Sequence, residues 1–192
     1  RFCAALGALA MLSELLGAAG ATAAEGRRML GDQEARAYRA VGRLNVAGRR
    51  FCTATLIAPD RVLTAAHCLY NPRTGRLTPL SMMRFVAGLR LGGYAAARRV
   101  ARAATPADYA YADRARYATV RNDLALLQLA APIAAETAAP LRVGRPLAGG
   151  DAATLVSYAR DRAHAPSVER PCRRRRASGP VSAIDCEVVQ GA

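Results

Sequence analysis

Residues 51–70 read FCTATLIAPDRVLTAAHCLY and contain two runs of apolar and β-branched residues, separated by Pro59-Asp60-Arg61. Two such runs with a proline- and aspartate-containing break between them are typical of a β-hairpin. The second run ends at His67, one of only 2 histidines in the chain, and a cysteine follows it directly. A histidine in this place is either a general base or a partly buried structural residue.

The same alternation of short strands and turn residues continues on both sides of this hairpin. Strand-like segments are expected at residues 41–46, 51–58, 62–66, 83–91, 97–104 and 123–130, and after them at residues 140–147, 151–160, 168–173 and 181–189. Residues 132–140, PIAAETAAP, separate the two groups, have a proline at each end and are interpreted as a linker. Many short strands without alternating helices predict an all-β fold built as a barrel or a sandwich.

The composition narrows the possible classes of protein. Of the 192 residues, 52% are hydrophobic, which is enough to fold around a core and excludes a disordered chain. The net charge is +14, and all 28 basic residues are arginine. No aromatic interleaving, zinc-ligand spacing or helix-turn-helix pattern accompanies this charge, so no specific nucleic-acid site, metal site or cofactor is predicted.

Residues 1–23 have the features of a secretory signal peptide. They begin with Arg1, continue with small apolar residues and end in Ala21-Thr22-Ala23, an A-x-A cleavage signal. We therefore expect the protein to be secreted or periplasmic. The alternative for this stretch is an N-terminal amphipathic helix.

Removal of the signal peptide would leave an even number of cysteines, namely Cys52, Cys68, Cys172 and Cys186. An even number in an exported chain predicts two disulfides. Of the three possible pairings, the sequential one closes two short loops and is the simplest. In the chain-entropy model, a disulfide that closes a loop of that size stabilises the fold by about 3 kcal/mol.

Asp123, in VRNDLALLQL, is a possible partner for His67. A histidine is a strong general base near neutral pH when a partner accepts its other ring N–H, and a buried carboxylate does this well. Asp123 stands at the start of an apolar run, where a carboxylate has no packing role. Taken singly, Asp123 would be a strand-entry cap and His67 a half-buried structural histidine.

Taken together, CTATLIAPDRVLTAAHC at residues 52–68 and VRNDLALLQLAAPI at residues 120–133 resemble the chymotrypsin/trypsin-like serine protease family. MRFVAGLR, RVAR and TLVSYAR also match, so that the resemblance covers residues 38–192. It implies two antiparallel six-stranded β-barrels of the chymotrypsin type, of which the second is incomplete. The implied organisation is an N-terminal segment at 24–37, a first barrel at 38–131, the linker at 132–140 and a partial second barrel at 141–192.

The resemblance also implies roles for individual residues. His67 would be the general base, Asp123 would orient it, and Cys68 would be bridged to the strand cysteine Cys52. Gly191 and Ala192 resemble the two residues before the nucleophilic serine, so Gly191 would supply an oxyanion-hole N–H. The serine itself is expected directly after Ala192, and the chain as given is expected to be inactive. The ending CEVVQGA resembles the bacterial branch that includes the glutamyl endopeptidases.

Three other residues are further candidates for roles in the site. Ser178, in RRASGPVS, imitates the nucleophile motif, but Arg176 occupies the place of a required glycine, so a turn within a disulfide-closed hairpin is favoured. Glu187 falls where trypsin-like enzymes place the acid that selects Arg or Lys, although an exposed strand position is favoured. His164 has no companions at ligand spacing and is interpreted as a loop histidine.

The sequence therefore predicts an exported serine endopeptidase, expected to be a monomer, that acts on protein or peptide substrates. The alternative is a protease-like, non-catalytic protein that binds anionic glycans or membranes, and a third possibility is a disulfide-stapled structural β-domain. The run Arg173, Arg174, Arg175 and Arg176 is either a solvated loop or the anionic-ligand surface of that binding protein.

Overall fold

The computed structural model describes residues 25–113, 119–178 and 181–192. The predicted signal peptide at residues 1–23, which includes Cys3, lies outside the described residues. None of the helices in the described ranges has both the length and the apolar character needed to cross a bilayer.

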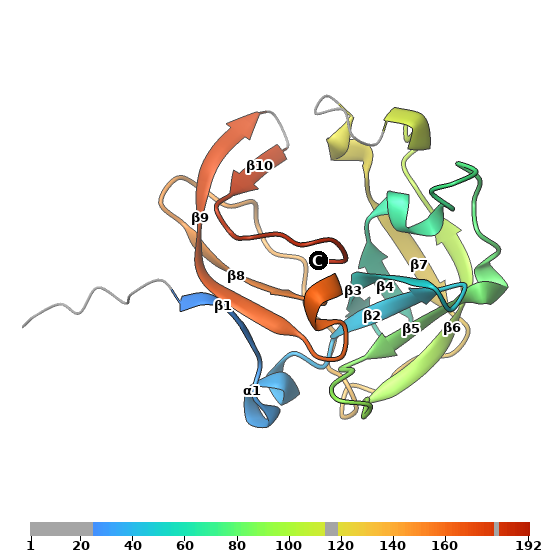
Figure 1. The fold of residues 1–192 in the computed structure, drawn as a ribbon, viewed down its shortest axis with the longest axis horizontal. Coiled ribbons are helices and arrows are strands. Elements are labelled where there is room, and N and C mark those ends of the chain that lie inside the picture. The colour runs from blue at the N-terminus through green and yellow to red at the C-terminus, as the bar shows by residue number, and fades with distance from the viewer. Residues whose placement is uncertain (1–24, 114–118, 179–180) are drawn as a thin grey trace, which may run out of the picture.

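Six antiparallel strands close into a barrel in the first part of the chain (Figure 1). Their order around the barrel is β2-β3-β4-β7-β6-β5. The strands are β2 (Val41–Val46), β3 (Arg50–Ala58), β4 (Arg61–Thr64), β5 (Met83–Ala87), β6 (Ala96–Ala104) and β7 (Ala125–Leu129). The six strands expected before residue 131 are confirmed, with shifted ends.

The helical elements are short and connect the strands. They are α1 (Asp32–Ala37) and the 3₁₀ turns η1 (Ala66–Leu69), η2 (Leu80–Met82), η3 (Tyr111–Asp113), η4 (Val120–Asn122) and η5 (Arg160–Arg162). Two of them matter for the site, because η1 follows β4 and η4 precedes β7.

Residues of the first strands alternate between buried and partly exposed, so that one face of each strand packs on the barrel core. In β2, Leu44 and Val46 are fully buried while the residues between and beside them are partly exposed. The turn from β2 to β3 passes through Ala47 and Gly48, which both have positive φ, as the two central residues of a type I′ turn require. Gly42 lies so close to Phe85 that an added Cβ would be 2.5 Å from its ring, so this position of β2 has no room for a side chain.

The second part of the chain forms a four-stranded sheet around the long strand β9 (Ser167–Ser178). Its other strands are β1 (Glu25–Met29), β8 (Ala152–Ser157) and β10 (Val181–Ile184), and each of them pairs antiparallel with β9. The N-terminal strand β1 thus belongs to the sheet built from the end of the chain. Arg27 anchors β1, since its side chain is only 8% exposed and its guanidinium donates to both oxygens of Asp161, at 2.6 and 3.1 Å.

The strand expected at residues 140–147 is wrong, because these residues form no strand. Pro140 and Pro146 lack the N–H that a ladder needs, and Gly144 weakens the segment further. Leu141 N nevertheless donates to Leu56 O at 2.9 Å, which fixes the segment to the first barrel. Strand β1 supplies the fourth strand of the second sheet in its place.

The two lobes are joined through Tyr158, a fully buried residue just after β8. Its hydroxyl donates to Leu89 O at 2.7 Å, and its backbone N–H donates to Thr53 Oγ1 at 2.8 Å. Arg43 of β2 also reaches across, donating to Ala163 O at 2.8 Å. The last residues of the chain lie in the same junction, between the barrel and the second sheet (Figure 1).

Candidate active site

His67 is placed by the end of strand β4 and by a disulfide. The chain leaves β4 at Thr64, whose hydroxyl donates to Thr53 O of the neighbouring strand at 2.8 Å, and then forms the turn η1. Within that turn Cys68 is bonded to Cys52 of β3, with a Cα–Cα distance of 6.2 Å. The turn is therefore tied to the barrel wall directly beside His67, whose side chain is 47% exposed.

Asp123 reaches His67 because β4 and β7 are neighbours in the barrel. Thr64 is paired with Ala125 across this ladder, so the residues just before β7 lie opposite those just after β4. Asp123 Oδ2 is 2.7 Å from His67 Nδ1, and the backbone N–H of His67 donates to Asp123 Oδ1 at 2.8 Å. Both carboxylate oxygens are thus used to hold one residue.

The Asp123 carboxyl is kept ionised by these contacts. Its side chain is only 12% exposed, and this burial raises its pKa, but hydrogen bonds from the His67 side chain and from the backbone of His67 and Ala66 outweigh burial and leave the pKa below its usual value. An ionised carboxylate at Nδ1 assigns the ring proton to that nitrogen. Nε2 of His67 is then left as the basic atom.

A cavity of about 520 Å³ opens beside His67. Its lining residues come from the first barrel and from the C-terminal segment, and they include both His67 and Gly191. Its lining residues are Arg49, Arg50, Phe51, Cys52, His67, Cys68, Pro72, Tyr111, Arg160, Gln190 and Gly191. His67 and Gly191 therefore line one space that is large enough for a peptide segment.

Gly191 is held in a conformation that favours glycine, with a φ of 101°. A Cβ added there would lie 2.8 Å from the Phe51 ring and 3.1 Å from Tyr158 O. The Gly191 carbonyl oxygen accepts hydrogen bonds from the backbone N–H and the hydroxyl of Thr53, both at 2.8 Å. The first barrel therefore holds the peptide unit between Gly191 and Ala192 in place.

Comparison with known proteins identifies the family. A family model described as Trypsin matches residues 30–172. The chain belongs to the trypsin family. A solved structure of a Glu endopeptidase in complex with MPD has the same fold, with a TM-score of 0.68, 18% identity, and coverage of 87% of this chain and 76% of that chain. None of the curated proteins matches the sequence significantly.

In this trypsin-family chain, both disulfides expected from the sequence are formed. Besides the bridge at His67, Cys172 of β9 is bonded to Cys186 with a Cα–Cα distance of 5.2 Å. Cys52, His67 and Cys68 also bring potential ligand atoms within 4.8 Å of one another. Because the two sulfurs are bonded to each other, they are not thiolates, and this group does not provide a ligand set for a metal ion.

The other sequence candidates are not brought to the cavity. Ser178 ends β9 and pairs with Val181 in the β9–β10 hairpin. His164 is exposed, and its backbone oxygen accepts a hydrogen bond from Leu91 N at 2.7 Å. His164 is not among the described residues that line the cavity containing His67.

Glu187 is exposed, as favoured from the sequence, but it is not without partners. Its side chain is 65% exposed, and its carboxylate lies 3.8 Å from Arg27 Nε. Its backbone N–H donates to the carboxylate of Glu169, at 2.9 and 3.1 Å. The contact with Arg27, on the N-terminal strand, had no signal in the sequence.

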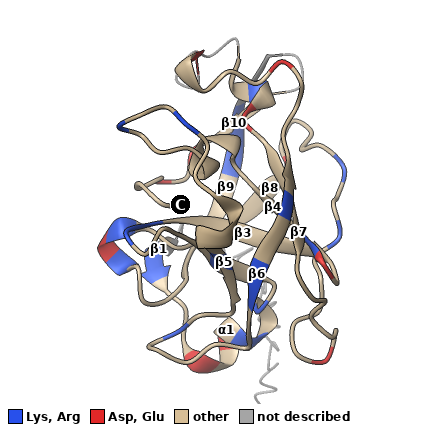
Figure 2. Ribbon diagram, turned by 90° about the vertical axis from the view of Figure 1, so that its right-hand side faces the viewer, with Lys and Arg blue, Asp and Glu red and all other residues tan. Residues whose placement is uncertain are grey.

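The arginine run lies along strand β9 (Figure 2). Arg173 is exposed, and Arg175 Nε lies 2.9 Å from Asp185 Oδ2. The backbone N–H of Arg173 donates to the same carboxylate at 2.6 Å. The run is therefore part of a regular strand with an acidic partner beside it.

Proposed function

We propose that the protein is a serine endopeptidase that hydrolyses peptide bonds, with the nucleophilic serine expected directly after Ala192. Membership of the trypsin family and the fold support a serine protease function. The observation that carries the proposal is the His67–Asp123 pair, joined at 2.7 Å, which shares one cavity with the positive-φ peptide of Gly191.

In the proposed reaction, His67 Nε2 accepts the serine proton as the serine oxygen attacks the peptide carbonyl. The Asp123 carboxylate holds Nδ1–H and stabilises the imidazolium that forms. Gly191 N–H and the serine N–H then bind the oxyanion. Nε2 passes its proton to the leaving amine, and a water molecule repeats the sequence of steps to release the acyl group.

The test begins with the coding sequence after the Ala192 codon. The completed protein is expressed and treated with a fluorophosphonate probe, which labels activated serines. We expect labelling of the completed protein, and no labelling of the 192-residue chain or of His67→Ala. The matched control is His164→Ala, because His164 is exposed and outside the cavity.

A completed chain that takes up no label, or that is labelled equally well after His67→Ala, would overturn the proposal. The binding protein predicted as the alternative would then be supported by tight, strongly salt-dependent binding to a heparin-like polyanion. The exposed Arg173 on β9 favours this alternative, and the carboxylate of Asp185 next to it weakens it.

We also propose that residues 1–23 direct export. The two disulfides support this, because such bonds persist in oxidising compartments. Expression in a bacterial host with residues 1–23 retained behind an added initiator methionine, followed by fractionation and N-terminal sequencing, tests it. Cleavage after Ala23 is expected, whereas an uncleaved cytoplasmic chain would contradict the proposal.

A further inference from the structure

The cavity beside His67 has an unbalanced charge. Three of its lining residues are arginines, Arg49, Arg50 and Arg160, and none of the described residues that line it is an aspartate or glutamate. Arg49 and Arg160 are exposed, and Arg50 is half-buried. A concave surface lined by charges of one sign concentrates ligands of the opposite sign.

The charges of these arginines are not neutralised by carboxylates in the described part of the chain. Arg50 Nη2 donates to the Thr78 hydroxyl, and Arg160 Nη1 donates to Gln190 Oε1, each at 3.3 Å. Both partners are uncharged. The carboxylate that contacts His67, that of Asp123, is only 12% exposed and is engaged by that histidine. The cavity therefore presents positive charge to whatever enters it.

The position of Nε2 indicates which part of a peptide enters. In the proposed reaction the leaving amine takes its proton from Nε2, so the residues after the scissile bond begin beside that atom. Nε2 lies 3.6 Å from Cys68 Sγ, and Cys68, Cys52 and Phe51 all line the cavity. Arg49 and Arg50 directly precede Phe51 in the chain and also line the cavity.

We propose that this cavity binds acidic residues, Asp or Glu, at the first positions after the scissile bond, and that Arg49, Arg50 and Arg160 determine this preference. The inference rests on the proposed function, since it names the peptide class that the same site would cut. It assigns no role to the residue before the scissile bond.

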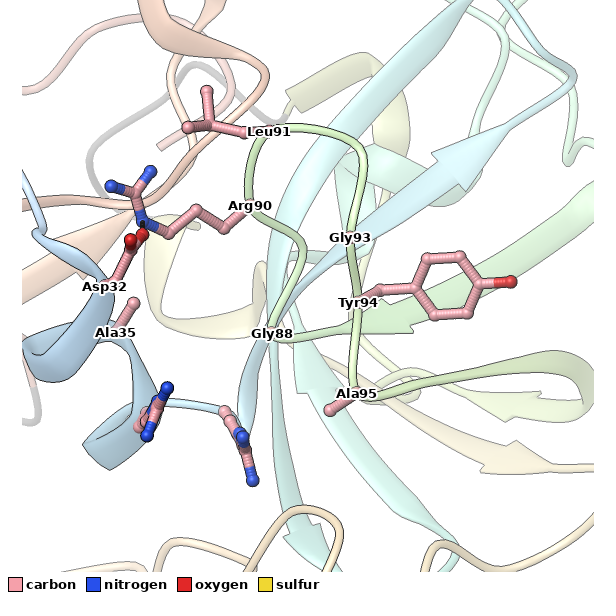
Figure 3. Close-up of a pocket in the computed structure, with 10 residues that line it drawn as sticks. Asp32, Ala35, Gly88, Arg90, Leu91, Gly93, Tyr94 and Ala95 are labelled. Atoms are coloured by element: carbon pink, nitrogen blue, oxygen red, sulfur yellow. Dashed lines mark ion pairs between the residues drawn. The ribbon is translucent and has the colours of Figure 1, made fainter.

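A second cavity offers a matched control. It measures about 300 Å³, is lined by Arg36, Arg39 and Arg90 among others, and shares no lining residue with the first (Figure 3). Here Asp32 points toward Arg90, with Oδ1 2.8 Å from Nε, so one of the charges is neutralised. Arg36→Gln/Arg39→Gln removes two positive charges, as a double substitution in the first cavity does, but away from His67.

The experiment compares peptides that differ only in the two residues after the cleaved bond, which are Asp-Glu, Asn-Gln or Lys-Lys. For the completed protein at low salt, we expect kcat/KM for the acidic peptide to exceed that for the neutral peptide by roughly 3- to 30-fold, as for two exposed ion pairs. The ratio should fall toward one in Arg49→Gln/Arg50→Gln and in 0.5 M salt, and it should persist in the control Arg36→Gln/Arg39→Gln. A ratio of one in the unsubstituted protein, or one unaffected by the double substitution, would overturn the inference.

A binding measurement separates this inference from the proposed function. Fluorescence anisotropy with the same peptides on His67→Ala needs no catalysis. If no peptide is cut but the acidic peptide binds in a manner that depends on Arg49 and Arg50, the hydrolysis proposal fails and the acid-binding cavity stands. If the peptides are cut and labelled serine is found, but no acidic preference appears in rate or in binding, the hydrolysis proposal stands and the cavity inference fails.

Discussion

The hydroxyl of Thr53 and the carbonyl of Gly191 connect the two lobes at the site. Thr53 lies in β3 of the barrel, and both its hydroxyl and its backbone N–H are 2.8 Å from the Gly191 oxygen. The same hydroxyl accepts the N–H of the buried Tyr158 at 2.8 Å. One side chain of the first barrel thus fixes the Gly191–Ala192 peptide, which directly follows the peptide whose N–H the proposed mechanism uses for the oxyanion.

Thr53→Val removes this hydroxyl with little change of shape. We expect the free energy of unfolding to fall by about 1–3 kcal/mol, because the buried N–H of Tyr158 loses its acceptor. The labelling rate with a fluorophosphonate should also fall, since the Gly191 peptide is less well held. Chemical denaturation and labelling kinetics on the completed protein measure both effects.

Thr55→Val is the control for this substitution, because Thr55 lies in the same strand and the described residues offer its side chain no hydrogen bond. Thr53→Ser, which keeps the hydroxyl, should retain most of the stability. Equal losses at Thr53 and Thr55 would show that the connection between the lobes contributes nothing of its own.

Gly191→Ala tests the positive-φ peptide. The added methyl would lie 2.8 Å from the Phe51 ring, and the φ of 101° is strained for alanine, so the peptide must move. Displacement of one oxyanion donor lowers kcat by about 10²–10³. Steady-state kinetics of the completed protein is the measurement.

Gly149→Ala provides the comparison, because an added Cβ there meets nothing within 4 Å. That variant should keep full activity. If Gly191→Ala were equally active, the assignment of its N–H to the oxyanion would be wrong.

Much of the barrel could be predicted from the sequence, because a strand with one buried face leaves a period of two. The break at Pro59-Asp60-Arg61 likewise marks the turn between β3 and β4. In contrast, β1 pairs with a strand from the other end of the chain, β9. The ion pair that anchors β1 joins Arg27 to Asp161, 134 residues away. No local sequence pattern encodes such a contact. The apolar residues of segment 140–147 favour a strand, but its two prolines, which cannot donate to a ladder, prevent one.

The site was predictable only in part, for a similar reason. His67 and Asp123 could be named from their motifs, but their contact depends on the pairing of β4 with β7. Thr53 and Tyr158 were missed because a threonine in a strand and a tyrosine in a core are ordinary. Their roles come from hydrogen bonds between lobes, which only the three-dimensional structure contains.

Asp123→Asn should nearly abolish catalysis while the fold is kept. An amide at this position no longer fixes the proton on His67 Nδ1 or stabilises the imidazolium, and in the Ser-His-Asp template this costs about 10⁴ in kcat. The measurement is peptide hydrolysis by the completed protein. A loss below tenfold would show that Asp123 does not orient the base.

Asp123 should also make stability depend on pH in a defined direction. Its pKa is lower in the folded protein than its ordinary value of 3.8. The stabilisation is therefore fully present above the unfolded pKa and is lost as the pH falls through the folded pKa. Urea unfolding of the protein and of Asp123→Asn should show a difference at pH 6 that shrinks below pH 4. A difference that grew toward low pH would contradict this sign.

The two disulfides should contribute similarly to stability but differently to activity. They join cysteines separated by 16 and 14 residues, so the chain-entropy model gives each about 3 kcal/mol. Only the Cys52–Cys68 bridge holds the turn that carries His67. We expect both double alanine variants to lose comparable unfolding free energy, and only Cys52→Ala/Cys68→Ala to lose labelling rate in the folded state. Equal labelling of the two variants would show that strand β4 and Asp123 position His67 without the disulfide.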